Sequence, residues 1–209
     1  MVGDYSFSPK YAVRMLKRCD PQLARLLDRV GPFRLELPGA ATPFQILVRS
    51  IIHQQLSGHA ARAIESRLTA LFPRRPTAAR LLALPPDALR GVGLSRAKVV
   101  AVRELAANTL SGTVPPRNRL LRMSDEEIVA QLTQIRGIGR WTVDMLLIFY
   151  LARPDVLPVT DLGIRKGLMR VYRLRHLPTP KETAQAGEKW RPYRSVASWY
   201  LWRSVDNTE

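Results

Sequence analysis

Hydrophobic residues recur along this chain mostly at intervals of three and four, which is the spacing of an amphipathic helix. One such face follows Pro43 and consists of Phe44, Leu47, Val48 and Ile51. The segment 141–151 is apolar on nearly every side, which is typical of a helix buried in the core. Strict alternation of apolar and polar residues is nearly absent, and only the segment 31–41 looks extended. The pattern therefore predicts an all-α protein.

Polar residues at helix boundaries indicate where several of these helices begin. Ser57 is placed to cap a helix, which leaves a tight turn at residues 54–58 before it. Ser124 and Glu127 have the spacing of a capping box, and they predict a helix that ends at Gly137. The apolar helix at 141–151 follows, so a Gly-x-Gly turn is expected to join two helices.

The charge of the chain narrows the choice of partner. The sequence has 33 Lys and Arg residues against 17 Asp and Glu residues, a net charge of +16. A folded domain with that charge is expected to bind a polyanion, most often nucleic acid, although a generic basic protein from an arginine-rich proteome is the alternative. Cys19 is the only cysteine, which excludes a disulfide framework, a thiolate zinc site and a four-cysteine iron–sulfur cluster. The longest apolar run is too short to span a bilayer, so we expect a soluble, cytoplasmic protein that does not bind membranes.

Two similar segments place Gly-apolar-Gly between apolar stretches: LRGVGLSR at 89–96 and IRGIGRWT at 135–142. Glycine permits a positive φ and a close approach of another backbone. The amides that open the following helix lack intrahelical partners and can bind an anion, which in a basic protein suggests a DNA phosphate. Gly-x-Gly alone is a weak signal, because such glycines often only end one helix and begin the next.

The wider context of the second copy, LTQIRGIGRWTVDMLLIFYLARPDVLPVTDLGIRKG at 132–167, resembles the helix-hairpin-helix DNA glycosylases. The resemblance is greatest to their alkylation-repair branch, 3-methyladenine DNA glycosylase II. It extends from about Pro43, through IIHQQLSGHAARAI, to KWRPYRSVASWYLW near the C-terminus. It implies that the partner is double-stranded DNA containing damaged bases.

The resemblance also implies the organisation of the chain. Residues 1–209 would form a single glycosylase domain of two helical lobes, with DNA bound between them. One lobe would span roughly 44–152, including the hairpin at 132–145, and the other would combine 1–43 with 153–209. The best-known long relatives begin with a sheet domain, and the residues before Pro43 are too few for a full one. We expect a monomer.

Asp161 occupies the position of the family's catalytic aspartate. Judged from the residues alone, an aspartate before LGIRKGLMRVY is an ordinary helix N-cap, and the two roles are compatible. The helix N-terminus favours a carboxylate, which would stabilise the positive charge that develops on deoxyribose as the glycosidic bond breaks. An ionised cap cannot donate a proton. The substrate is therefore expected to be a base that already leaves well, such as a positively charged N-alkylated purine.

Trp141 stands where the bifunctional members of the superfamily carry a lysine that attacks the sugar. Tryptophan cannot form a Schiff base, so the resemblance implies a monofunctional enzyme that leaves an abasic site uncut. It also places Trp141, Met145 and Trp202 in the base pocket, where aromatic faces would attract a cationic base. For Trp190 and Trp199 we expect packing in the core instead.

The resemblance further assigns contacts with DNA. The turn HQQLS corresponds to the family's wedge, with Gln55 in the gap left by a flipped base and Gln54 and Ser57 beside it. The alternative is that Gln54 and Gln55 simply end a helix on the protein surface. In the second hairpin the expected phosphate contacts are Gly137, Gly139, Arg140 and Thr142. We interpret the copy at 89–96 primarily as a connection between helices, with a second phosphate contact as the alternative.

No cofactor is expected to be required. The family's hairpin often holds a Na⁺ or K⁺ ion through main-chain oxygens, and the corresponding residues are Thr133, Ile135 and Ile138. Two other functions stay open at this stage. One is a DNA-binding module without enzymatic activity, against which the presence of Asp161 and Trp202 argues. The other is a glycosylase of the same fold for an oxidised or deaminated base, which only the shape of the pocket could decide.

Overall fold

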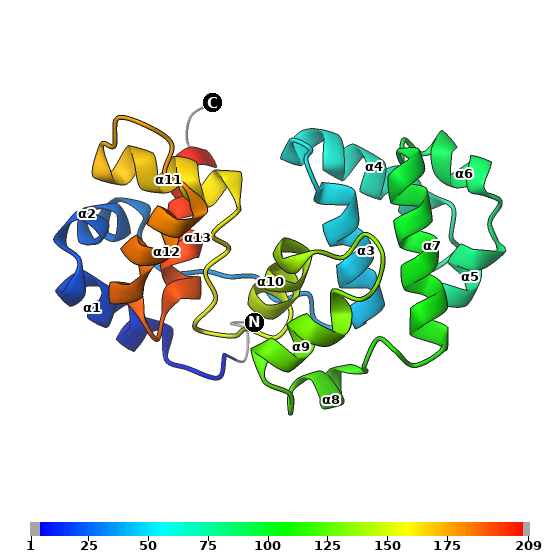
Figure 1. The fold of residues 1–209 in the computed structure, drawn as a ribbon, viewed down its shortest axis with the longest axis horizontal. Helices are drawn as coiled ribbons and strands as arrows, with labels where there is room; N and C mark the ends of the chain where they lie inside the picture. Colours follow the sequence, from blue (N-terminus) through cyan, green and yellow to red (C-terminus); the bar gives the residue numbers. More distant parts are fainter. Residues whose placement is uncertain (1–4, 207–209) are drawn as a thin grey trace. The chain divides into compact units, whose positions relative to one another are not determined.

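A computed structural model describes residues 5–206, and over these residues the chain is helical, with no strand (Figure 1). The prediction of an all-α protein is confirmed. The chain divides into two compact units. We call Pro38–Leu146 the central unit and Met1–Leu37 with Leu147–Glu209 the terminal unit. No helix in the described part of the chain is long and apolar enough to cross a bilayer.

The central unit is built around α7, which packs against α3 and α5 (Figure 1). Its helices are α3 (Pro43–His53), α4 (Gly58–Ala70), α5 (Ala78–Ala83), α6 (Pro86–Gly91), α7 (Arg96–Leu110), α8 (Arg117–Leu120), α9 (Asp125–Leu132) and the larger part of α10 (Arg140–Phe149). The apolar face expected after Pro43 is buried, as are most side chains of α10. The apolar residues that recur at helical intervals in the sequence are therefore the residues that form the core.

Side-chain caps explain where these helices begin. Ser57 accepts a hydrogen bond from the amide of Ala60 at 3.3 Å, as its place before α4 predicts. Ser124 and Glu127 form the expected capping box at the start of α9. The end of α9 was predicted too late, because the helix stops at Leu132, before Gly137, and the residues between form a turn.

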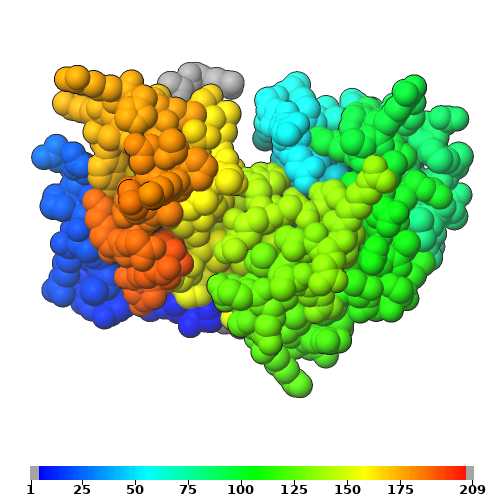
Figure 2. Space-filling model, in the orientation of Figure 1, coloured from blue at the N-terminus to red at the C-terminus, as the bar shows by residue number. Residues whose placement is uncertain are grey.

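The terminal unit joins helices from both ends of the sequence. They are α1 (Pro9–Cys19), α2 (Pro21–Val30), α11 (Leu162–Tyr172), α12 (Pro180–Gly187), the 3-10 turn η1 (Glu188–Trp190) and α13 (Arg194–Asp206). In Figure 2 blue and orange segments lie side by side in this unit, in keeping with the contacts of α1 with η1 and of α2 with α13. Trp190 and Trp199 are 0% and 7% exposed, which confirms that they belong to the core.

Asp20 is a buried carboxylate that ties α2 to residues near the other end of the chain. It caps α2 by accepting a hydrogen bond from the amide of Leu23 at 3.0 Å. Its Oδ2 also accepts from Nε1 of Trp190 at 2.8 Å, from Nζ of Lys189 at 2.9 Å, and from the hydroxyl of Tyr172. Burial alone raises the pKa of Asp20, but these hydrogen bonds outweigh burial and hold that pKa below its ordinary value.

Candidate functional site

Asp161 is the N-cap of α11, as its place in the sequence predicts. Its Oδ1 accepts a hydrogen bond from the amide of Ile164 at 2.8 Å and another from the indole Nε1 of Trp202 at 2.9 Å. Trp202 lies on α13, and its ring stacks on Phe149, with 5.4 Å between the ring centroids. Two of the residues expected at the site are thus in direct contact within the terminal unit, although they are 41 positions apart.

Gly163 makes the contact between Asp161 and Trp202 sterically feasible. A Cβ atom at this position would lie 2.9 Å from Cδ1 of Trp202 and 3.1 Å from Oδ1 of Asp161. Neither Gly163 nor Phe149 was expected at the site from the sequence. A glycine in the first turn of α11, where it weakens the helix, is a signal that could have been noticed.

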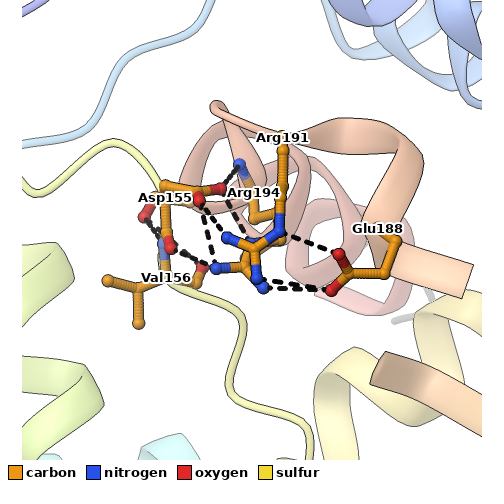
Figure 3. Close-up of polar contacts among 7 residues, drawn as sticks. Asp155, Val156, Glu188, Arg191 and Arg194 are labelled. Atoms are coloured by element: carbon orange, nitrogen blue, oxygen red, sulfur yellow. Dashed lines mark hydrogen bonds and ion pairs between the residues drawn. The ribbon is translucent and has the colours of Figure 1, made fainter. Parts of the chain in front are cut away.

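The loop that leads to Asp161 is fastened to the start of α13 and to Arg191 just before it by ion pairs and hydrogen bonds (Figure 3). Asp155 accepts from Nε of Arg194 at 2.7 Å and from Nη1 of Arg191 at 2.7 Å. The next residue, Val156, donates its amide to Oγ of Ser195 at 2.9 Å. Because α13 also carries Trp202, the same helix positions the indole and holds the loop that precedes Asp161.

The second hairpin, between α9 and α10, uses its two glycines differently. Gly137 has a φ of +87°, and a Cβ there would lie 2.3 Å from the Cβ of Ala101 on α7. Gly139 directly precedes α10, and a Cβ there would meet nothing within 4 Å. Because Gly139 has no side chain, position 139 places no side chain over the start of α10. This is the arrangement that an anion site at a helix N-terminus requires.

The first copy, at 89–96, has a different geometry. Here the second glycine, Gly93, has the positive φ, +105°. Ser95 follows it and caps α7 with its own hydroxyl, which accepts from the amide of Lys98 at 3.3 Å. Arg67 from α4 covers the turn, with its Nε donating to the carbonyl of Val92 at 2.9 Å. These contacts favour the simple role of a connection between helices.

The expected wedge turn joins α3 to α4. Gln55 is exposed and has a φ of 56°, in the left-handed region. Gln54 donates from Nε2 to the carbonyl of Gly137 at 3.0 Å and to Oγ1 of Thr142 at 2.8 Å. The side chain of Thr142 is only 1% exposed, and its hydroxyl supports the wedge turn from inside the protein. The expected contact of Thr142 with DNA stays a prediction.

Three further predicted residues lie in the central unit. Trp141 and Met145 lie on α10 in the central unit, the first half-buried and the second 8% exposed. Ser57 is exposed but uses its hydroxyl as the cap of α4. Their roles toward base and DNA remain predictions.

Asp144 is a buried acid on α10 that the sequence reasoning did not single out. It is 3% exposed and accepts a hydrogen bond from Nε of Arg140 at 2.9 Å. Burial raises the pKa of Asp144 to about 6, although Arg140 acts in the opposite direction. The side chain of Arg140 is otherwise well exposed, as a phosphate contact requires.

The carbonyls expected to hold a monovalent cation all lie in the turn between α9 and α10. The carbonyl of Ile135 accepts from the amide of Ile138 at 3.0 Å and keeps a second lone pair, and Thr133 is the C-cap of α9, where the turn begins. Main-chain carbonyl oxygens are suitable ligands for Na⁺ or K⁺, and the cation site stays a prediction. Within the described residues no three His, Cys, Asp or Glu side chains gather as metal ligands.

Comparison with known proteins gives this geometry a context. Residues 48–192 match the HhH-GPD superfamily of base excision DNA repair proteins. DNA-3-methyladenine glycosylase 1 of Schizosaccharomyces pombe is 37% identical over 90% of this chain and 84% of that protein. DNA-3-methyladenine glycosylase 2 of Escherichia coli is 29% identical over 88% and 67%. The structure of the S. pombe enzyme Mag1 in complex with abasic DNA superimposes with a TM-score of 0.89, at 36% identity over 92% of this chain and 95% of that one.

The chain belongs to the HhH-GPD superfamily of base excision DNA repair proteins. The resemblance to this superfamily that the hairpin, Asp161 and the C-terminal motif indicated is therefore confirmed.

Proposed function

We propose that this chain is a monofunctional DNA glycosylase that removes N-alkylated purines, such as 3-methyladenine and 7-methylguanine, from double-stranded DNA. It hydrolyses the N-glycosidic bond and leaves an abasic site for base excision repair. The observation that carries the proposal is Asp161 at the start of α11, oriented by Trp202 and the amide of Ile164, in a chain of this family. We also propose that it acts as a monomer in the cytoplasm.

The contacts of Asp161 suit the stabilisation of positive charge. As the glycosidic bond breaks, deoxyribose acquires oxocarbenium character, and a fixed carboxylate lowers the energy of that state without having to reorganise. Oδ1 of Asp161 accepts from two donors, and the indole N–H can only donate, so this oxygen is not a source of protons. The base must then leave without a proton from Oδ1, which an alkylated purine does because it already carries a positive charge.

Trp141 supports the absence of strand cleavage. It is the second residue of α10, where the resemblance places the lysine of the bifunctional enzymes. Without an amine there, no covalent Schiff base with the sugar forms at this position, and the product is an intact strand with an abasic site. We assign a wall of the base pocket to Trp202, which lies beside Asp161 in the terminal unit.

Base release from defined duplexes tests this proposal. A duplex that carries one 7-methylguanine or 3-methyladenine is incubated with wild-type protein, and the products are examined before and after alkali. We expect wild type to release the base, with strand cuts only after alkali, and Asp161→Asn to be slower by about 10²-fold or more. Asp28→Asn is the matched control, because it makes the same chemical change at an exposed site in the terminal unit.

Each other outcome has a definite meaning. Tight binding to the duplex without release of either base would refute the proposed activity and favour a binding module. Release of an oxidised or deaminated base alone would assign the same fold another substrate. Strand cutting before alkali would refute the argument from Trp141.

A further inference from the structure

The wedge turn holds a glutamine in a conformation that glutamine rarely adopts. The amide of Leu56 donates to the carbonyl of His53 at 3.3 Å, and Gln54 has a φ of −53° and a ψ of 126°. With the φ of 56° at Gln55, this is the geometry of a type II turn. The second central position of that turn favours glycine or asparagine, so Gln55 stays there only because its surroundings hold it.

Two side chains hold the turn through hydrogen bonds to different parts of the central unit. Lys98 on α7 donates from Nζ to the carbonyls of Ile52 at 2.7 Å and Gln54 at 2.9 Å, which fixes the end of α3. The side chain of Gln54 reaches the hairpin instead, where Nε2 donates to the carbonyl of Gly137 and to Oγ1 of Thr142. All of these residues belong to the central unit.

The orientation of the Gln54 amide follows from its partners. The carbonyl of Gly137 can only accept, so the atom 3.0 Å from it must be the NH₂ group. That group has two hydrogens, and the two contacts use both. Gln54 was expected to contact DNA, but its donors are directed to the protein's own hairpin.

We propose that Gln54 is a positioning residue that couples the phosphate-binding hairpin to the insertion of Gln55 into DNA. The carbonyl that it contacts belongs to Gly137, three residues before Arg140, the first residue of α10. A hairpin fixed on a phosphate therefore fixes the turn that carries Gln55, the next residue along the chain. The inference rests on the proposed function, because it presumes that a nucleotide is flipped out of the duplex.

A double-mutant cycle tests this coupling without requiring base release. The probe is a duplex with a tetrahydrofuran abasic analogue and 2-aminopurine opposite it, whose fluorescence reports on filling of the gap. Titration gives the equilibrium constant of the inserted complex for wild type, Gln54→Met, Gln55→Ala and the double variant. Methionine has nearly the same length as glutamine but donates no hydrogen bond.

We expect Gln54→Met to weaken the inserted complex about tenfold, because two neutral hydrogen bonds are lost. In that background Gln55→Ala should cost little more, since the wedge is no longer held in place. Gln131→Ala is the matched control: its Nε2 also donates to a main-chain carbonyl of the central unit, that of Thr113 at 2.7 Å. The effects of Gln131→Ala and Gln55→Ala on the equilibrium constant should multiply, as expected for independent sites.

If the effects of Gln54→Met and Gln55→Ala on the equilibrium constant of the inserted complex simply multiply, the coupling is refuted. If Gln54→Met does not fold, Thr142→Val removes one of the two acceptors in a nearly isosteric way, and the same cycle applies with an expected loss of about threefold. The two proposals fail separately. Base release by wild type with multiplying effects refutes only the coupling, whereas coupling on the tetrahydrofuran duplex without release of alkylated bases refutes only the proposed activity.

Discussion

The two glycines of the second hairpin predict opposite effects when each is replaced by alanine. Gly137 combines a φ of +87° with a close approach to Ala101, whereas Gly139 has open space where a Cβ would point. Gly137→Ala should therefore reduce the stability of the fold. Gly139→Ala should leave the fold nearly unchanged and should obstruct whatever binds outside the hairpin.

The structure sets the sizes of these effects. A left-handed conformation costs an ordinary residue about 1–2 kcal/mol, and overpacking costs about 1–3 kcal/mol. The Cβ of Ala101, 2.3 Å away, cannot rotate aside, so we expect Gly137→Ala to lower the free energy of unfolding by about 2–5 kcal/mol. Alanine in place of glycine before α10 costs at most about 1 kcal/mol. Losing charge-assisted hydrogen bonds to a phosphate corresponds to about 10- to 100-fold in affinity.

Two measurements separate the effects. Urea unfolding gives the stability of each variant, and duplex binding over a range of salt concentrations gives the affinity and its salt slope. Gly139→Ala should bind more weakly at every salt concentration, with a salt slope close to that of wild type, since the contact removed involves neutral amides and no cation is lost. Wild-type affinity for Gly139→Ala would refute the anion site, and wild-type stability for Gly137→Ala would refute the close packing on α7.

Asp20→Asn should lower the free energy of unfolding by about 3 kcal/mol, because buried donors lose a charged acceptor. The exposed Asp28→Asn should lower it by less than about 1 kcal/mol. Equal losses in urea unfolding would contradict this. Gly163→Ala should slow single-turnover base release about tenfold with duplex affinity kept, since its Cβ displaces Trp202; an unchanged rate would show that the contact is dispensable. Burial raises the pKa of Asp144 to about 6, so folding favours its protonated form, and up to about 3 kcal/mol of stability is lost as pH rises from about 4 to 6. Urea unfolding across that range should show a flatter profile for Asp144→Asn, and an equally steep one would contradict the assignment.

The sequence predicted most of the fold because helix spacing and caps are local properties. The apolar face after Pro43, the cap at Ser57 and the capping box at Ser124 all occur as expected. The end of α9 was missed, because Ile135 keeps the helical spacing and is buried even though it lies in a turn. Burial of an apolar residue does not reveal whether its backbone is helical.

The site was less accessible to sequence reasoning, because its contacts join distant residues. The identity of Asp161 followed from the resemblance, but its bond with Trp202 depends on how α11 and α13 pack. Gln54 and Thr142 were both expected on DNA, and nothing in their spacing indicated that they bond to each other. The two Gly-x-Gly segments look alike in sequence, yet different glycines adopt the positive φ in each.

The left-handed Gln55 has a consequence for engineering this enzyme. Glycine or asparagine at position 55 would relieve about 1 kcal/mol of backbone strain, and a selection for heat resistance alone would therefore favour them. Either replacement would shorten the side chain proposed to occupy the gap in DNA. At this position a gain in thermostability is expected to reduce repair activity. A library of variants that is screened for melting temperature should therefore keep Gln55 unchanged.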